Sequence, residues 1–353
     1  MGRCVVWMEL WWAAALLPSL SLAQSLPHPA TSAAEQYHAH ALELAASSQD
    51  AEAGAWFRKA WEEDRAEIRY VQDLTIYYIH HHKYSDAQAI IRDCVERLGP
   101  TAMAWTLQGE LLFEEKQYDP AYQSLRSALD LQNQNYRAHE LIGLIFSIHR
   151  RYSLALEEMK LAAQQNPSSA QVRFYCGRLY YQTANYAAAR EELLACLNLH
   201  PGYPEALENL GLAYEAMGEP STAIIQYRKA IELEKAGKTP PSEFSYVCLG
   251  VLLKSQSGNQ EALTLLREAV AKNHNSAWAN FELGRLYFEA GKDALAERHL
   301  KRSAELDKNY SRPHFFLGKL YARARRQPES QSEFATFQAL DKDLDNRQPQ
   351  LTR

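Results

Sequence analysis

The sequence predicts an all-α fold, a right-handed superhelical solenoid of helix–turn–helix repeats, and two periodic series support this prediction. A glycine returns every 34 residues, with one step of 39, at Gly109, Gly143, Gly177, Gly211, Gly250, Gly284 and Gly318. An alanine keeps a constant offset of 12 from that register, at Ala53, Ala87, Ala121, Ala155, Ala189, Ala223, Ala262 and Ala296. Only 15 of the 353 residues are glycine, so a repeated unit is the one sensible account of this register.

Residues 204–234 indicate what each repeat contains. One helix face is marked by the spacing i, i+3, i+4, i+7 at Leu207, Leu210, Gly211 and Tyr214. A second face follows at Ala223, Tyr227 and Ala230. Between them Gly218 ends one helix and Pro220 begins the next. We expect Gly211 and Ala223 to be small because the backbones of the two helices approach closely where they cross.

This pattern resembles the tetratricopeptide repeat family, whose signature positions are filled here by Leu207, Leu210-Gly211, Tyr214, Ala223, Tyr227 and Ala230. The resemblance implies about nine repeats over residues 34–344, starting near residues 34, 68, 102, 136, 170, 204, 243, 277 and 311. The first two and the last repeat depart from the pattern, as terminal repeats that cap a stack often do. We expect a longer loop at 235–241, with a domain break there as the alternative, and a polar tail at 345–353.

The N-terminus predicts a cleaved signal peptide over residues 1–23. Arg3 precedes an apolar run from about Leu10 to Leu22, and Ser21 and Ala23 are small residues at the −3 and −1 positions of a cleavage site. A linker at 24–33 would follow. The mature chain is then exported, periplasmic or secreted, and the alternative is an uncleaved segment that anchors the chain in a membrane.

Four cysteines remain after such cleavage, namely Cys94, Cys176, Cys196 and Cys248. They form no CxxC pair, and three of them fall at small or apolar packing positions of the repeat. We therefore expect buried thiols that act as small hydrophobic side chains, and no disulfide framework.

Charge and motifs argue against several classes of function. A net charge of −5 gives no footprint for nucleic acid, whose binding proteins carry a basic surplus. The sequence has no G-x-S-x-G, no P-loop and no G-x-G-x-x-G. The run His80-His81-His82 lies at an expected turn without a further ligand at fixed spacing, so we expect a solvated loop there. We predict a non-catalytic chain with no cofactor and no metal.

The resemblance also implies where a partner would bind. In this family the first helix of each repeat lines the concave surface through its second, fifth, ninth and twelfth residues. In the C-terminal half these positions combine aromatic and cationic side chains, the usual anchors of binding surfaces. We predict partner contacts at Phe174, Arg178, Tyr181, Trp278, Phe281, Arg285, Phe288, Arg312, Phe315 and Lys319. The alternative is that these aromatic rings pack between adjacent first helices.

We therefore expect a scaffold or adaptor of a bacterial-type envelope that binds a protein or peptide carrying apolar and acidic side chains in this groove. The family's clamp for a C-terminal carboxylate is not reproduced, because Glu140 and Glu208 stand where a cation would help. No stable membrane insertion is expected once the signal peptide is cleaved. The alternative function is a regulatory or substrate-presenting subunit of an envelope enzyme complex.

Overall fold

The computed structural model describes residues 32–47, 49–255 and 259–347, and every regular element in these ranges is an α-helix. The expected signal peptide, the linker up to Thr31 and residues 348–353 of the expected tail lie outside the described residues. Two units can be distinguished, Met1–Pro167 and Ser168–Arg353. The division between them falls after Pro167, whereas the alternative weighed from the sequence placed a break at 235–241.

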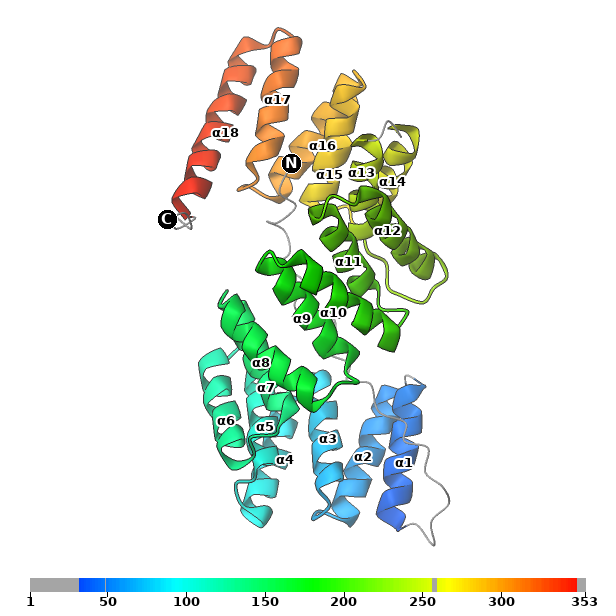
Figure 1. Ribbon diagram of the computed structural model, residues 1–353, viewed down its shortest axis with the longest axis vertical. Helices are drawn as coiled ribbons and strands as arrows, with labels where there is room; N and C mark the ends of the chain where they lie inside the picture. The colour runs from blue at the N-terminus through cyan, green and yellow to red at the C-terminus, as the bar shows by residue number, and fades with distance from the viewer. Residues whose placement is uncertain (1–31, 48, 256–258, 348–353) are drawn as a thin grey trace. The chain divides into compact units, whose positions relative to one another are not determined.

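In the N-terminal unit eight helices follow one another as four antiparallel pairs (Figure 1). Their bounds are α1 Ala33–Ala46, α2 Asp50–Glu63, α3 Ile68–His80, α4 Tyr84–Leu98, α5 Ala102–Glu114, α6 Tyr118–Leu131, α7 Tyr136–Ile148 and α8 Tyr152–Gln165. The second helix of one pair packs against the first helix of the next, and α5 lies against both α3 and α7.

The C-terminal unit continues with five pairs. Their bounds are α9 Ala170–Gln182, α10 Tyr186–Leu199, α11 Pro204–Ala216, α12 Pro220–Lys235, α13 Phe244–Ser255, α14 Asn259–Lys272, α15 Ala277–Glu289, α16 Asp293–Leu306, α17 Ser311–Arg323 and α18 Gln327–Arg347. The five extra residues form a connection inside this unit, where α12 still packs against α13. The last helix extends to Arg347, three residues into the expected tail.

The two helices of a repeat cross at the recurring glycine. A Cβ built on Gly109 would lie 2.6 Å from the Leu125 side chain and 3.3 Å from the carbonyl oxygen of Ala121. A Cβ on Gly177 would lie equally close to the carbonyl of Ala189. Both alanines are fully buried. The predicted close approach of the two backbones is therefore confirmed in these repeats.

In seven repeats the turn between the two helices has one residue in the left-handed backbone region. Seven repeats show it in register, with φ between 55° and 79°, at His82, Lys116, Arg150, Ala184, Gly218, Gly291 and Arg325. The tight turn requires this conformation, which side-chain-bearing residues adopt at a cost. The histidine run belongs to such a turn: α3 ends at His80, and the His82 Nδ1 lies 2.8 Å from the Tyr84 hydroxyl.

Polar pairs link the two helices of a repeat at one further register position. The fourth residue of the first helix meets the second helix in His139–Glu158 at 2.6 Å, Arg173–Glu192 at 3.0 Å and His314–Glu333 at 2.7 Å. The hydrogen bond that the His139 ring donates to the Glu158 carboxylate raises the pKa of His139. In these three repeats the pairs hold the same faces of the two helices together.

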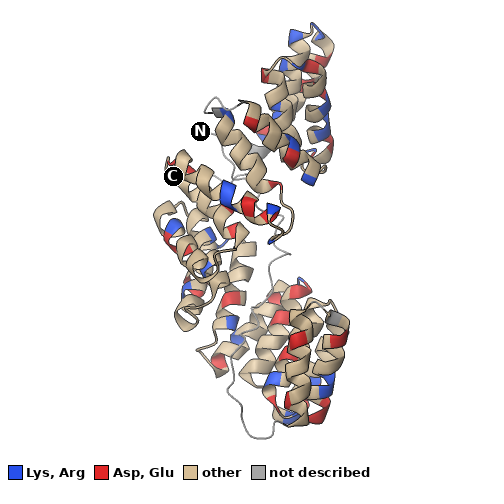
Figure 2. Cartoon of the chain, turned by 90° about the vertical axis from the view of Figure 1, so that its right-hand side faces the viewer, with Lys and Arg blue, Asp and Glu red and all other residues tan. Residues whose placement is uncertain are grey.

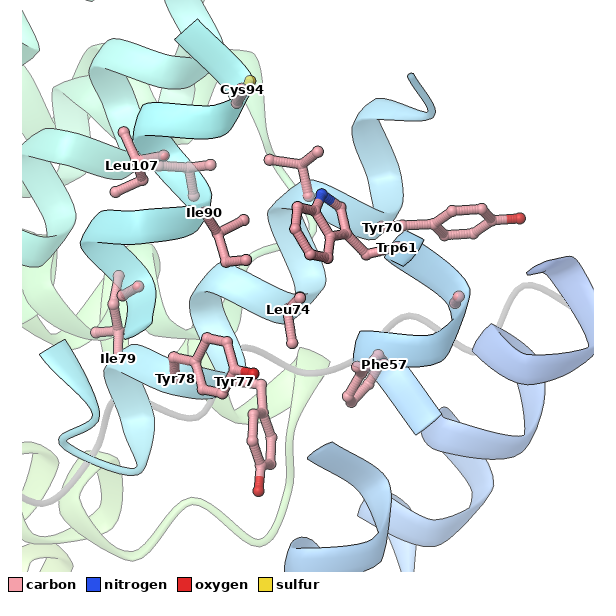
Figure 3. Packing of buried hydrophobic residues seen from close by; sticks show 14 of the residues in the cluster. Phe57, Trp61, Tyr70, Leu74, Tyr77, Tyr78, Ile79, Ile90, Cys94 and Leu107 are labelled. Atoms are coloured by element: carbon pink, nitrogen blue, oxygen red, sulfur yellow. The ribbon is translucent and has the colours of Figure 1, made fainter. Parts of the chain in front are cut away.

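Apolar side chains of successive helices fill the space between repeats. Figure 3 shows Phe57 and Trp61 of α2, Leu74 of α3 and Ile90 of α4 converging in the N-terminal unit. Cys94 of α4 belongs to the same cluster and is 1% exposed. All four cysteines of the described residues are buried thiols, as expected, and burial raises the pKa of Cys94 and Cys196.

Replacing Gly109 by alanine tests the close approach. We expect a loss of unfolding free energy of about 1–2 kcal/mol, because overpacking against Leu125 outweighs the better helix propensity of alanine. Urea unfolding followed by circular dichroism measures it. The matched control is Gly202→Ala, where the new methyl group meets no atom within 4 Å. An equal effect of the two substitutions would contradict the packing argument.

Candidate functional site: the first-helix strip

We define the first-helix strip as the second, fifth, ninth and twelfth residues of repeats five to nine, counted from residues 170, 204, 243, 277 and 311; they lie on α9, α11, α13, α15 and α17 of the C-terminal unit. First helices of successive repeats lie beside each other, since α9 packs against α11 and α15 packs against both α13 and α17. Side chains at these positions of adjacent repeats are therefore neighbours, although they are more than twenty residues apart in sequence.

Two of the predicted contact residues are buried. Phe281 is 0% exposed, and its ring lies 5.1 Å from Tyr310 and 5.7 Å from Phe316, measured between ring centres. Phe174 is 3% exposed and lies 5.1 Å from Tyr203. These two rings pack between helices, which is the alternative weighed from the sequence, and they offer a partner almost no surface.

Three other aromatic rings of the strip are partly exposed. Trp278 lies 5.6 Å from Phe244 of the preceding repeat. Phe288 lies 5.6 Å from Phe316, and Phe315 contacts the same ring from the neighbouring position. Phe316 is not one of the four positions of the strip and was therefore not predicted. Its place directly after Phe315 in the sequence was a signal that a second ring lies beside the strip.

Cations accompany these rings in repeats eight and nine. The guanidinium of Arg312 lies 4.7 Å from the centre of the Phe281 ring, and the ammonium of Lys319 lies 5.1 Å from that of Phe315. Both cationic side chains are exposed, whereas Arg285 is half-buried. Positive and negative residues are interspersed along the helices in Figure 2.

The remaining predicted residues belong to repeat five. Arg178 lies 5.5 Å from the Phe174 ring centre, and Tyr181 lies 5.4 Å from Tyr186. Helix α9, which carries them, packs against α10 and α11, whereas α15 packs against α13, α16 and α17. The predicted residues therefore form two groups, one in repeat five and one in repeats eight and nine.

A buried carboxylate lies under the second group. Glu282 is 3% exposed, and its Oε2 lies 2.5 Å from Nη2 of Arg285. Burial raises the pKa of Glu282, while Arg285, Arg312 and Lys254 act in the opposite direction. The sequence stripe missed this residue because it occupies the sixth position of its helix.

Repeat six presents a different chemistry. The carboxyl group of Glu208 is approached by the hydroxyl of Ser245 at 2.9 Å and by that of Ser242 at 3.5 Å, with no ion-pair partner among the described contacts. Burial raises the pKa of Glu208 to about 8; the Ser245 hydrogen bond lowers it, and Glu205 and Glu243 raise it further. An uncharged carboxyl at neutral pH cannot serve as a fixed charge for a partner.

The described residues hold no group of three or more His, Cys, Asp and Glu side chains placed to bind a metal ion. Nor does any helix in the described ranges combine the length and the apolar character that crossing a membrane requires.

The raised pKa of Glu208 predicts a pH-dependent stability. Between its ordinary value of 4.5 and about 8 the folded state binds more protons than the unfolded state, so the unfolding free energy falls as pH rises through this window. The unfolding free energy, measured by thermal melts between pH 5 and 9, should fall in the native chain. In Glu208→Gln it should fall less, and the difference between the two proteins should be about 1–3 kcal/mol. The exposed Glu219→Gln is the control; parallel pH profiles for all three proteins would contradict the assignment.

Comparison with known proteins places this geometry in context. Tetratricopeptide repeat models match residues 176–239 and 256–324, so the C-terminal unit contains tetratricopeptide repeats. The BBSome complex member bbs-4 of Caenorhabditis elegans is 22% identical over 178 residues, covering 50% of this chain and 38% of that protein. Anaphase-promoting complex subunit 3 of Schizosaccharomyces pombe is 28% identical over 131 residues, 36% of this chain and 19% of that protein.

The type IV pilus assembly protein PilF of Pseudomonas aeruginosa is 28% identical over 113 residues, 31% of this chain and 45% of that protein. The chain thus spans less than half the length of each of these relatives. Among solved structures, the Cut9–Hcn1 hetero-tetramer of the anaphase-promoting complex aligns with a TM-score of 0.65 and 19% identity, over 82% of this chain and 56% of that one. The all-α tetratricopeptide solenoid predicted from the sequence is therefore confirmed as the fold class.

Proposed function

We propose that this chain is a non-catalytic scaffold or adaptor that binds a partner protein or peptide on the first-helix strip of repeats eight and nine. One observation supports this most directly: the exposed Lys319 lies beside the partly exposed ring of Phe315, and the exposed Arg312 lies over the buried ring of Phe281 in the same pair of repeats. Aromatic and arginine side chains bury large areas with few rotatable bonds, which makes them frequent centres of binding energy.

The chemistry of the strip favours a partner segment with apolar and acidic side chains. Trp278, Phe288 and Phe315 offer apolar surface, and the cations around them would oppose a basic segment. The buried ring of Phe281 supports this surface without reaching a partner, because both Arg312 and Phe316 pack against it. Arg178 and Tyr181 of repeat five would form a second contact for a longer segment.

A role as a subunit of a larger assembly is the second candidate. Two of the relatives are named as members of multi-protein complexes. If the assembly is an envelope enzyme complex, the chain would regulate the enzyme or present its substrate. Co-purification of the chain with an enzymatic activity that the isolated chain lacks would distinguish this role from that of a passive scaffold.

We also propose that the chain is exported by its N-terminal segment, on the strength of the apolar run from Leu10 to Leu22 and the small residues Ser21 and Ala23. Intact-mass spectrometry of the chain isolated from envelope fractions should find a mature N-terminus at Gln24. A mass that retains Met1 in the membrane fraction would favour the anchored alternative.

A crosslinked pull-down from the native envelope fraction tests the binding surface. We expect the double variant Arg312→Ala/Lys319→Ala to reduce partner recovery about tenfold, equivalent to a loss of about 1.4 kcal/mol. Both side chains are exposed, so the fold should be retained. The charge-matched control is Arg302→Ala/Lys308→Ala, two exposed cations of α16 and the loop that follows. Equal recovery by both double variants would place the interface elsewhere.

A further inference from the structure

We infer that repeats eight and nine bind a carboxylate side chain of the partner between Arg285 and Arg312. The inference rests on the proposed function and names the chemical group that the strip recognises. It comes from comparing these repeats with repeats three and four of the same chain, where the equivalent positions are filled differently.

In the N-terminal unit the ninth residue of α5 and the second and fifth residues of α7 form an ion-pair network of two carboxylates and one arginine. Arg137 donates through Nη2 to the carboxylate of Glu110 and through Nη1 to Oε2 of Glu140 at 2.9 Å. The side chains of the two glutamates are only 5% and 4% exposed, and that of Arg137 is 18% exposed. One arginine here is held by two carboxylates from the chain itself.

Five repeats further along, the same three positions hold Arg285, Arg312 and Phe315. Glu110 is replaced by Arg285, and Glu140 is replaced by Phe315. Helices α15 and α17 pack against each other as α5 and α7 do, so the two arginines lie at neighbouring positions. Arg312 therefore stands where Arg137 does, but the two glutamates that bind Arg137 have no counterpart at these positions.

The local charges of repeats eight and nine do not balance. Glu282 pairs with Arg285, and the Nε of Arg285 is buried without a hydrogen-bond partner. Other cations nearby are neutralised by the chain: Lys254 by Glu289 at 2.5 Å, and Arg323 by Asp293. Arg312 forms no direct ion pair among the described residues: it lies over the Phe281 ring and beside Tyr310, and it shares with Arg285 the field of the single buried carboxylate of Glu282.

A carboxylate is the group that best matches the excess positive charge at Arg285 and Arg312. Guanidinium groups bind carboxylates through paired hydrogen bonds, and such charge-assisted bonds are about twice as strong as neutral ones. Repeats three and four show that this register accommodates carboxylates beside an arginine. The rings of Phe288, Phe315 and Phe316 flank the position, so the residue next to the partner's Asp or Glu would be apolar.

Selection from a random dodecapeptide phage library tests the inference on the full chain. The native chain should enrich peptides with an Asp or Glu beside an apolar residue. The variant Arg312→Gln should lose that acidic preference, and the control Arg302→Gln should keep it. The exposed Arg312 is preferred to Arg285 for this test, because removing Arg285 would leave the buried Glu282 without its partner.

A selected peptide then provides a double-mutant cycle. Changing its acidic residue to the amide should weaken binding to the native chain about tenfold or more, and should have little effect on binding to Arg312→Gln. Enriched peptides without an acidic preference, or an additive cycle, would overturn the carboxylate assignment and leave the groove as a binding surface. No enrichment over the bare support would overturn the proposed function together with it.

Discussion

The close contact between the two helices of each repeat is the constraint on which the rest of the structure depends. At four of the recurring glycines, a Cβ would lie 3.2–3.4 Å from the carbonyl oxygen of a buried alanine twelve residues later, closer than an ordinary contact. Because this contact recurs in register, these helix pairs approach each other at the same positions, and neighbouring first helices present the same register positions to each other. A strip of chemically distinct side chains can then vary on a constant frame.

The fold could be predicted because its cause is periodic. The Gly109 and Ala121 series report a contact inside one repeat, and the sequence repeats that contact along the chain. The division after Pro167 could not be predicted in this way, since the 34-residue register continues across it without a change. The alternative break at 235–241 followed composition, yet α12 and α13 remain packed together on either side of that loop.

The candidate site was only partly predictable. The helical register correctly places aromatic and cationic residues on first helices, but it does not say how deeply a ring lies between them. Phe281 is covered because Tyr310 and Phe316 come from the next repeat, at spacings that a single-helix pattern does not consider. Glu282 was missed because it lies at the sixth position of α15, outside the four positions of the stripe. A spacing of 27 residues, as between Glu110 and Arg137, is the signal that connects adjacent first helices.

The left-handed residue found in the turns of seven repeats has a consequence for how firmly different parts of the array are held. Repeats six and eight use Gly218 and Gly291 there, whereas other repeats use residues with side chains, such as Lys116 and Arg150. Each of the latter costs about 1–2 kcal/mol relative to glycine in that backbone region. The stability of such an array is close to a sum over its repeats, so the local stability should differ from one repeat to the next. Local loosening can be tuned at the turns without altering any residue that faces a partner.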